Sequence, residues 1–227
     1  MIIYSLFLFF EHLTQKFEST KMPDKKSSQN YDIKREQIIE AAEDTFAYYG
    51  YHKTTLEDIA KKVGIKKNSI YYYFKSKEDL LNEIITRIYK WKIDQFEKET
   101  VSVKSTKVKL KIFFLMLISP IVTDKKTYNV TPNAFIEIGR VIYESFREFY
   151  QNTEFYLTTI LKEGIKKGEL KKIDTEKTAQ TILLFVQAVE MFEYSQITSK
   201  FIDKPTFDKL EIEISNFIDL IYNGIKK

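Results

Sequence analysis

The chain has 227 residues, of which 44% are hydrophobic and 30% charged, a composition typical of a folded globular protein. It contains no cysteine, which excludes disulfide frameworks, thiolate metal sites, iron–sulfur clusters and a cysteine nucleophile. The two histidines, His12 and His52, leave little room for a metal site or a catalytic triad, and six glycines and four prolines favour helices over a β-sandwich or barrel.

The positive charge of the chain is concentrated in one window. The formal net charge is +4, yet residues 51–77 alone carry seven lysines against two acidic residues, Glu57 and Asp58. A basic window on an otherwise near-neutral chain indicates a site for a polyanion, or else a solvated helical face.

Residues 1–31 are predicted to form an amino-terminal extension. Residues 2–10 are almost wholly apolar, but a bilayer span takes about 20 apolar residues, and the basic region and cleavage site of a secretory signal are missing. Two interpretations stay open: the natural start is Met22 and residues 1–21 are upstream sequence, or they form an amphipathic packing or membrane-touching helix. The polar run 24–30 predicts a flexible arm.

Apolar residues then recur at helical spacing. They predict a first helix that is capped by Asp32 and ends before Gly50. The capping-box spacing that begins at Thr55 predicts a short second helix over residues 56–63, and Gly64 permits a sharp turn after it.

Residues 67–74 predict a third helix, with Ile70 and Phe74 facing inward. A further capping box at Ser76 opens a long helix to about residue 98. Two short helices joined by a glycine-containing turn and braced by a preceding helix form a helix-turn-helix, whose second helix reads the major groove. Lysine and tyrosine can donate to phosphates there, and asparagine can pair with adenine.

Residues 35–85 resemble the amino-terminal domain of the TetR family of bacterial transcriptional regulators. The matching positions are Ile38, Ala41, Ala42, Phe46, Gly50, Thr54, Thr55, Ile59, Ala60, Gly64, Ile70, Tyr71, Phe74, Lys77 and Leu80. Two positions depart from the family pattern. Lys66 stands where a capping serine is usual, and Asn68 stands where a small residue is usual, so the base sequence that is read cannot be taken from relatives.

The resemblance implies DNA-binding roles for eight residues. They are Thr55, Lys66, Lys67, Asn68, Tyr71, Tyr72, Tyr73 and Lys77. Thr55 and Lys77 are expected to contact phosphates, so that Lys77→Ala reduces the salt slope of DNA binding by about one unit. For the three tyrosines core packing is the alternative, and it is weakest for Tyr72.

The carboxy-terminal part reads as five further helices. Periodicity and caps predict them over residues 107–118, 132–150, 152–167, 175–198 and 205–225. The resemblance implies an inducer pocket among the central helices for a bulky apolar or aromatic ligand. Candidate lining residues, for each of which core packing is the alternative, are Phe113, Phe114, Leu117, Phe135, Ile142, Phe146 and Phe185.

The last two long helices, residues 176–198 and 205–225, are expected to pair with their copies in a second subunit as a four-helix bundle. We therefore expect an all-α protein with an extension (1–31), a TetR-type DNA-binding domain (32–93, with the helix-turn-helix at 55–74) and a helical ligand-binding and dimerisation domain (94–227).

The function expected is that of a ligand-responsive regulator, a repressor by family default, that binds an inverted repeat of double-stranded DNA as a homodimer. It is expected in the bacterial cytoplasm, associated with the nucleoid through DNA, with no membrane contact, metal, cofactor or catalytic residue. The alternative is a helical dimeric small-molecule-binding or interaction protein without specific DNA binding. A helical enzyme is disfavoured because no metal spacing, nucleophile elbow or phosphate loop is found, and Glu137, Glu190 and Glu193 have no evident partners. A membrane-tethered regulator stays open if residues 1–21 are genuine.

Overall fold

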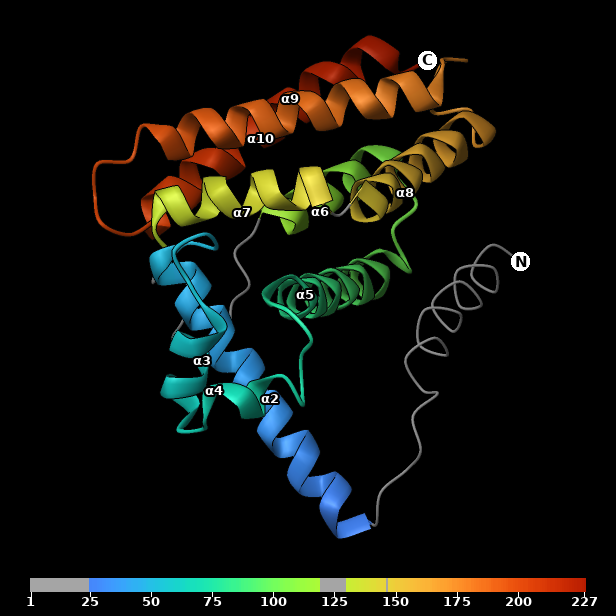
Figure 1. Cartoon of the computed structure of the whole chain (residues 1–227). Helices are drawn as coiled ribbons and strands as arrows, with labels where there is room; N and C mark the ends of the chain where they lie inside the picture. The colour runs from blue at the N-terminus through green and yellow to red at the C-terminus, as the bar shows by residue number, and fades with distance from the viewer. Residues whose placement is uncertain (1–24, 119–129, 146) are drawn as a thin grey trace. The chain divides into compact units, whose positions relative to one another are not determined.

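The computed structural model describes residues 25–118, 130–145 and 147–227, which are helical nearly throughout (Figure 1). The prediction of an all-α protein is confirmed. The helices are α2 (Lys25–Tyr49), α3 (Leu56–Val63), α4 (Lys67–Ile70), α5 (Lys77–Thr100), α6 (Thr106–Ile118), α7 (Pro132–Ser145), α8 (Arg147–Lys166), α9 (Thr175–Ser195) and α10 (Lys204–Ile225). The chain divides into two compact units, residues 1–37 and 38–227, and α2 runs through the boundary.

Side-chain caps fix where the helices begin. The Thr55 hydroxyl accepts the Asp58 N–H at 3.2 Å and the Asp58 carboxylate accepts the Thr55 N–H at 2.9 Å, which is the predicted capping box of α3. Ser76 caps α5 by accepting the Asp79 N–H at 3.0 Å, but the Asp79 carboxylate accepts the Lys75 N–H, also at 3.0 Å, in place of the reciprocal bond of the predicted capping box. α3 ends as predicted at Gly64, whose φ of +74° is the left-handed conformation that glycine adopts without steric cost.

Three predicted boundaries were wrong. α2 begins at Lys25, so Asp32 lies inside the helix and does not cap it. Residues 25–30 of the run predicted as a flexible arm are helical, because no proline or glycine interrupts the sequence after Pro23. α4 ends at Ile70, because the N–H groups of both Tyr73 and Phe74 donate to the Ile70 carbonyl at 3.0 Å and turn the chain.

The third correction concerns the region around residue 150. One helix was expected up to residue 150 and another from residue 152. The helices instead end at Ser145 and begin at Arg147, and residue 146 lies outside the described residues. The prediction placed the break five residues too late, because no glycine or proline marks the junction in the sequence.

Two hydrophobic clusters form the interior of residues 38–227. The first lies between α2, α3, α4 and the start of α5, and includes Phe46, Ile59, Ile70, Phe74 and Leu80. The second lies between the later helices and includes Phe96, Phe113, Phe114, Leu161, Ile182 and Ile214. α7 contributes to both: Phe135 and Ile136 pack on the second cluster, whereas Val141 belongs to the first.

The later helices surround α6, which contacts α5, α8 and α10. This explains why the second half of α6, residues 112–118, is apolar on every side, with Phe113 and Phe114 fully buried. α9 and α10 also contact each other.

Candidate nucleic-acid interface

α4 and the turn that follows it present a polar and aromatic ridge to solvent. Ile70 and Phe74 anchor this segment in the first cluster, with 0% and 2% of their surfaces exposed. Opposite these anchors, Lys66, Lys67 and Asn68 are exposed. A helix held by two apolar side chains on one face offers its other face to a ligand.

The three tyrosines after Ile70 differ in exposure. Tyr72 is the most exposed at 69%, Tyr71 is exposed at 50%, and Tyr73 is half-buried. The rings of Tyr72 and Tyr73 meet edge to face, with centroids 5.2 Å apart. Tyr71 and Tyr72 therefore do not pack in the core, and Tyr73 supports the position of the Tyr72 ring.

Two of the predicted DNA contacts are already engaged within the protein. The ammonium of Lys67 forms an ion pair with the Glu57 carboxylate at 2.8 Å, between exposed side chains of α4 and α3. The hydroxyl of Thr55 belongs to the capping box and also donates to the Asp58 carboxylate at 2.6 Å. An exposed ion pair contributes little to stability, so Lys67 can exchange Glu57 for a phosphate.

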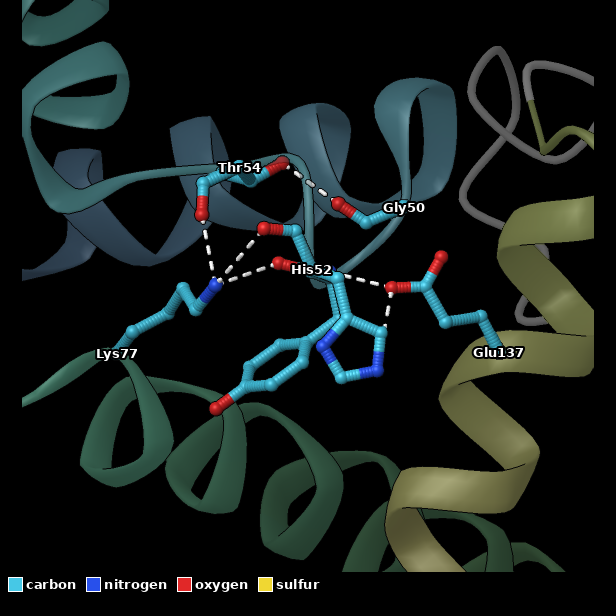
Figure 2. Close-up of polar contacts among 6 residues, drawn as sticks. Gly50, His52, Thr54, Lys77 and Glu137 are labelled. Atoms are coloured by element: carbon cyan, nitrogen blue, oxygen red, sulfur yellow. Dashed lines mark hydrogen bonds and ion pairs between the residues drawn. The ribbon is translucent and has the colours of Figure 1, made fainter.

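Lys77 lies in the first turn of α5, but its ammonium is directed at the loop between α2 and α3 (Figure 2). It donates to the carbonyls of Tyr51 at 2.7 Å and Thr54 at 2.8 Å, and lies 4.3 Å from the centre of the Tyr51 ring. Burial lowers the pKa of Lys77, and the charge of Glu137 opposes that shift. This geometry favours a role for Lys77 in fixing the loop, and its predicted phosphate contact stays a prediction.

Glu137 of α7 holds the same loop from the other side (Figure 2). Its carboxylate accepts the backbone N–H of His52 and lies 3.8 Å from the His52 ring nitrogen Nε2. The loop that leads into α3 is therefore held by α5 through Lys77 and by α7 through Glu137. Sequence reasoning missed this role for Glu137, because 85 residues separate it from His52 and no local pattern marks the contact.

The predicted effector residues do not all lie together. Phe113, Phe114, Leu117 and Phe135 gather in the second cluster. Ile142 packs against the first cluster instead, because α7 turns this face toward the DNA-binding helices. Phe185 is exposed and stacks on Phe217, with ring centroids 3.8 Å apart, on the surface of α9 and α10. Phe146 lies outside the described residues.

The described part of the chain offers neither a membrane-spanning helix nor a metal site. None of its helices combines the length and apolar character that a bilayer crossing needs. Nor do three or more histidine, aspartate or glutamate side chains in that part come together in an arrangement that could hold a metal ion.

Comparison with known proteins agrees with this geometry. Residues 38–84 match the family described as bacterial regulatory proteins, tetR family. The fatty acid metabolism regulator protein of Bacillus subtilis is 30% identical over 147 residues, which cover 64% of this chain and 76% of that protein. The HTH-type transcriptional regulator YhgD of the same organism is 28% identical over 154 residues, covering 66% of this chain and 78% of the relative.

Among solved structures, the fatty acid degradation regulator FadR from Bacillus halodurans superposes with a TM-score of 0.59 at 25% identity, covering 87% of this chain and 96% of that one. The likeness thus extends beyond the helix-turn-helix to the later helices. The matched family, the relatives and the exposed ridge on α4 lead to one conclusion: the chain belongs to the TetR family and is a DNA-binding transcriptional regulator.

Proposed function

We propose that this regulator is a ligand-responsive repressor that binds an inverted repeat as a homodimer. The observation that carries the proposal is the α4 ridge: Lys66, Asn68 and Tyr72 are exposed on a segment anchored from behind by Ile70 and Phe74. One such short segment reads only a few base pairs. Two copies related by a two-fold axis would read half-sites about 34 Å apart, one turn of DNA.

An apolar surface on α9 and α10 supports the dimer. Leu184 is 66% exposed and Leu220 is 72% exposed. A groove of about 410 Å³ between the two helices is lined by Phe185, Phe192, Phe217 and Leu220, with Glu193 and Glu213 also present. Large apolar side chains gathered on one surface mark an interface. In a two-fold dimer the same surface of each subunit packs against its copy, and this apolar surface would fill that role.

The names of the relatives support an effector class. One relative is named for fatty acid metabolism and one solved structure for fatty acid degradation. The apolar second cluster, with Phe113, Phe114 and Leu117, suits an aliphatic chain. We therefore place an acyl-type effector among α5, α6, α7 and α9, where its binding would lower the affinity for DNA.

DNA binding is tested by fluorescence anisotropy, with duplexes selected from a random pool and measured over a salt series. A steep negative slope of log affinity against log salt is expected, at about 0.9 per neutralised phosphate. Lys66→Met is expected to flatten the slope by about one unit. Lys172→Met, the same charge change at an exposed lysine before α9, is the matched control and should leave it unchanged. Selection that yields no inverted repeat would favour a small-molecule-binding protein without specific DNA binding.

Sedimentation tests the dimer. Leu220→Asp is expected to yield monomers, because a carboxylate would be buried without a partner in the interface. Val101→Asp places the same change on a side chain that is 87% exposed in the turn after α5, and should leave the dimer intact. A wild-type monomer at micromolar concentration would contradict the proposed assembly.

A further inference from the structure

A lysine is buried inside the part of the protein where we place the effector. Lys92 of α5 is only 8% exposed, and its ammonium donates to the Leu117 carbonyl in the last turn of α6 at 2.7 Å. Burial lowers the pKa of Lys92 to about 8. Lysines are rarely buried unless a charge or a ligand compensates them. Lys92 thus places a charged hydrogen-bond donor among largely apolar helices.

Two polar side chains of α9 belong to the surroundings of Lys92. Glu190 and Tyr194 are one turn apart and so lie on the same face of the helix. The Glu190 carboxylate is close enough to act electrostatically on both Lys92 and Tyr194. Tyr194 is 1% exposed, and its hydroxyl has no hydrogen-bond partner among the described residues. A buried hydroxyl without a partner is unfavourable until something accepts its proton.

The surroundings of these polar groups are apolar. The Phe135 ring lies 4.2 Å from the Tyr194 ring, measured between centroids, and the Phe207 ring lies at 6.3 Å. Tyr194 belongs to the same cluster as the fully buried Phe113 and Phe114. A few convergent polar groups in an otherwise apolar environment are characteristic of sites for small amphipathic molecules.

We propose that Lys92 and Tyr194 bind the carboxylate of an aliphatic carboxylic acid, whose hydrocarbon chain lies among the surrounding aromatic side chains. This inference rests on the proposed ligand-responsive function and specifies its chemistry. An ammonium and a phenol both donate, and a carboxylate offers only acceptors, so the three groups are complementary. A cationic ligand would instead meet the charge of Lys92.

The Glu190 carboxyl group can accommodate the carboxylate of the proposed ligand nearby. Burial raises the pKa of Glu190 to about 7, against the opposing charge of Lys92. The carboxyl group can therefore take up a proton when an anion binds, as one member of a close pair of carboxylates does. Protonated Glu190 then offers a third donor to the ligand.

The test is isothermal titration of the full chain with sodium dodecanoate, and with methyl dodecanoate, dodecanol and dodecyltrimethylammonium as neutral and cationic counterparts. Dodecanoate is expected to bind the wild type more tightly than the other three. Lys92→Met keeps the length of the side chain and removes its charge, and Tyr194→Phe removes only the hydroxyl. We expect losses in dodecanoate affinity of at least about tenfold and of about threefold to tenfold, respectively, with little change for methyl dodecanoate.

The inference is overturned if Lys92→Met and Tyr194→Phe bind dodecanoate as the wild type does, or if the wild type prefers the ester, the alcohol or the cation. Circular dichroism checks that each variant folds. If Lys92→Met does not fold, the comparison of Tyr194→Phe with the wild type tests the inference by itself. DNA anisotropy is measured on the same samples. A wild type that binds its operator but not dodecanoate refutes the carboxylate and leaves the regulator proposal standing, whereas a wild type that binds no DNA refutes the regulator proposal itself.

Discussion

Replacing Gly50 with alanine tests the contact between α7 and the loop that precedes α3. Gly50 has a φ of +87°, and a β-carbon built there lies 3.3 Å from Glu137 Cδ and closer still to Glu137 Oε2. The substitution therefore does two things at once. It forces alanine into the left-handed region, and it displaces the carboxylate that accepts the His52 N–H.

The two effects have separable magnitudes. Left-handed alanine costs about 1–2 kcal/mol, and the less flexible unfolded chain returns about 0.4–1 kcal/mol of that. Losing a hydrogen bond to a charged acceptor costs about 1.5–3 kcal/mol. The Glu137 side chain is 23% exposed, so water replaces part of that bond. We expect Gly50→Ala to lower the free energy of unfolding by about 2–3 kcal/mol in all.

Gly168→Ala is the matched control, since Gly168 has a φ of +78° with no atom within 4 Å of the added β-carbon. Gly168→Ala should lower the free energy of unfolding by about 1 kcal/mol, which is the cost of the left-handed conformation alone. Urea unfolding of Gly50→Ala, Glu137→Ala and the double variant completes a thermodynamic cycle. In the Glu137→Ala background, Gly50→Ala should cost no more than the control. Equal costs for the two glycines in the wild-type background, or an excess at Gly50 that survives the loss of Glu137, would refute the reasoning.

Three further changes have definite expectations. Thr55→Ala should lower the free energy of unfolding by about 1 kcal/mol through loss of the α3 cap, as measured by urea unfolding. Lys77→Met should lower it by about 1–3 kcal/mol because two loop carbonyls lose their donor; unchanged stability with a salt slope flattened by about one unit would instead show a phosphate contact. Because the pKa of Lys92 falls from 10.5 to about 8 on folding, the unfolded chain binds more protons between those values, so stability should rise with pH there. Lys92→Met should lose that rise in urea unfolding between pH 8 and 10, and a wild type whose rise matches the variant's would contradict the buried charge.

The helix-turn-helix was predictable because its determinants are local. The capping box at Thr55, the left-handed glycine at position 64 and the apolar spacing of α3 all act within a few residues. The length of α4 was not predictable in the same way. It depends on both Tyr73 and Phe74 donating to one carbonyl, which reflects how Phe74 enters the core and not any helix-breaking residue.

The polar contacts between elements distant in the chain could not be predicted for a different reason. Glu137 and Glu190 were recognised in the sequence as helical carboxylates without evident partners. Their partners lie far away in the chain: Glu137 binds the N–H of His52, and Glu190 acts on Lys92 of α5. When tertiary packing brings a side chain to its partner, no regular spacing in the sequence marks the contact. Such contacts become visible only when the helices are assembled.

α7 connects the proposed effector site with the DNA-binding helices by simple helix geometry. Successive residues are turned by about 100°, so side chains two positions apart face nearly opposite directions. Phe135 accordingly packs on Tyr194 of α9, whereas Glu137 holds the loop before α3. At the start of the helix, the Thr131 N–H donates to the Ala47 carbonyl of α2 at 3.0 Å. Because a helix moves as a unit, we expect an effector that displaces Tyr194 and Phe135 to move Glu137 with them. Coupling between two sites is typically about 1–3 kcal/mol, which is close to the contribution of a hydrogen bond to a charged acceptor, such as the one that the His52 N–H donates to Glu137.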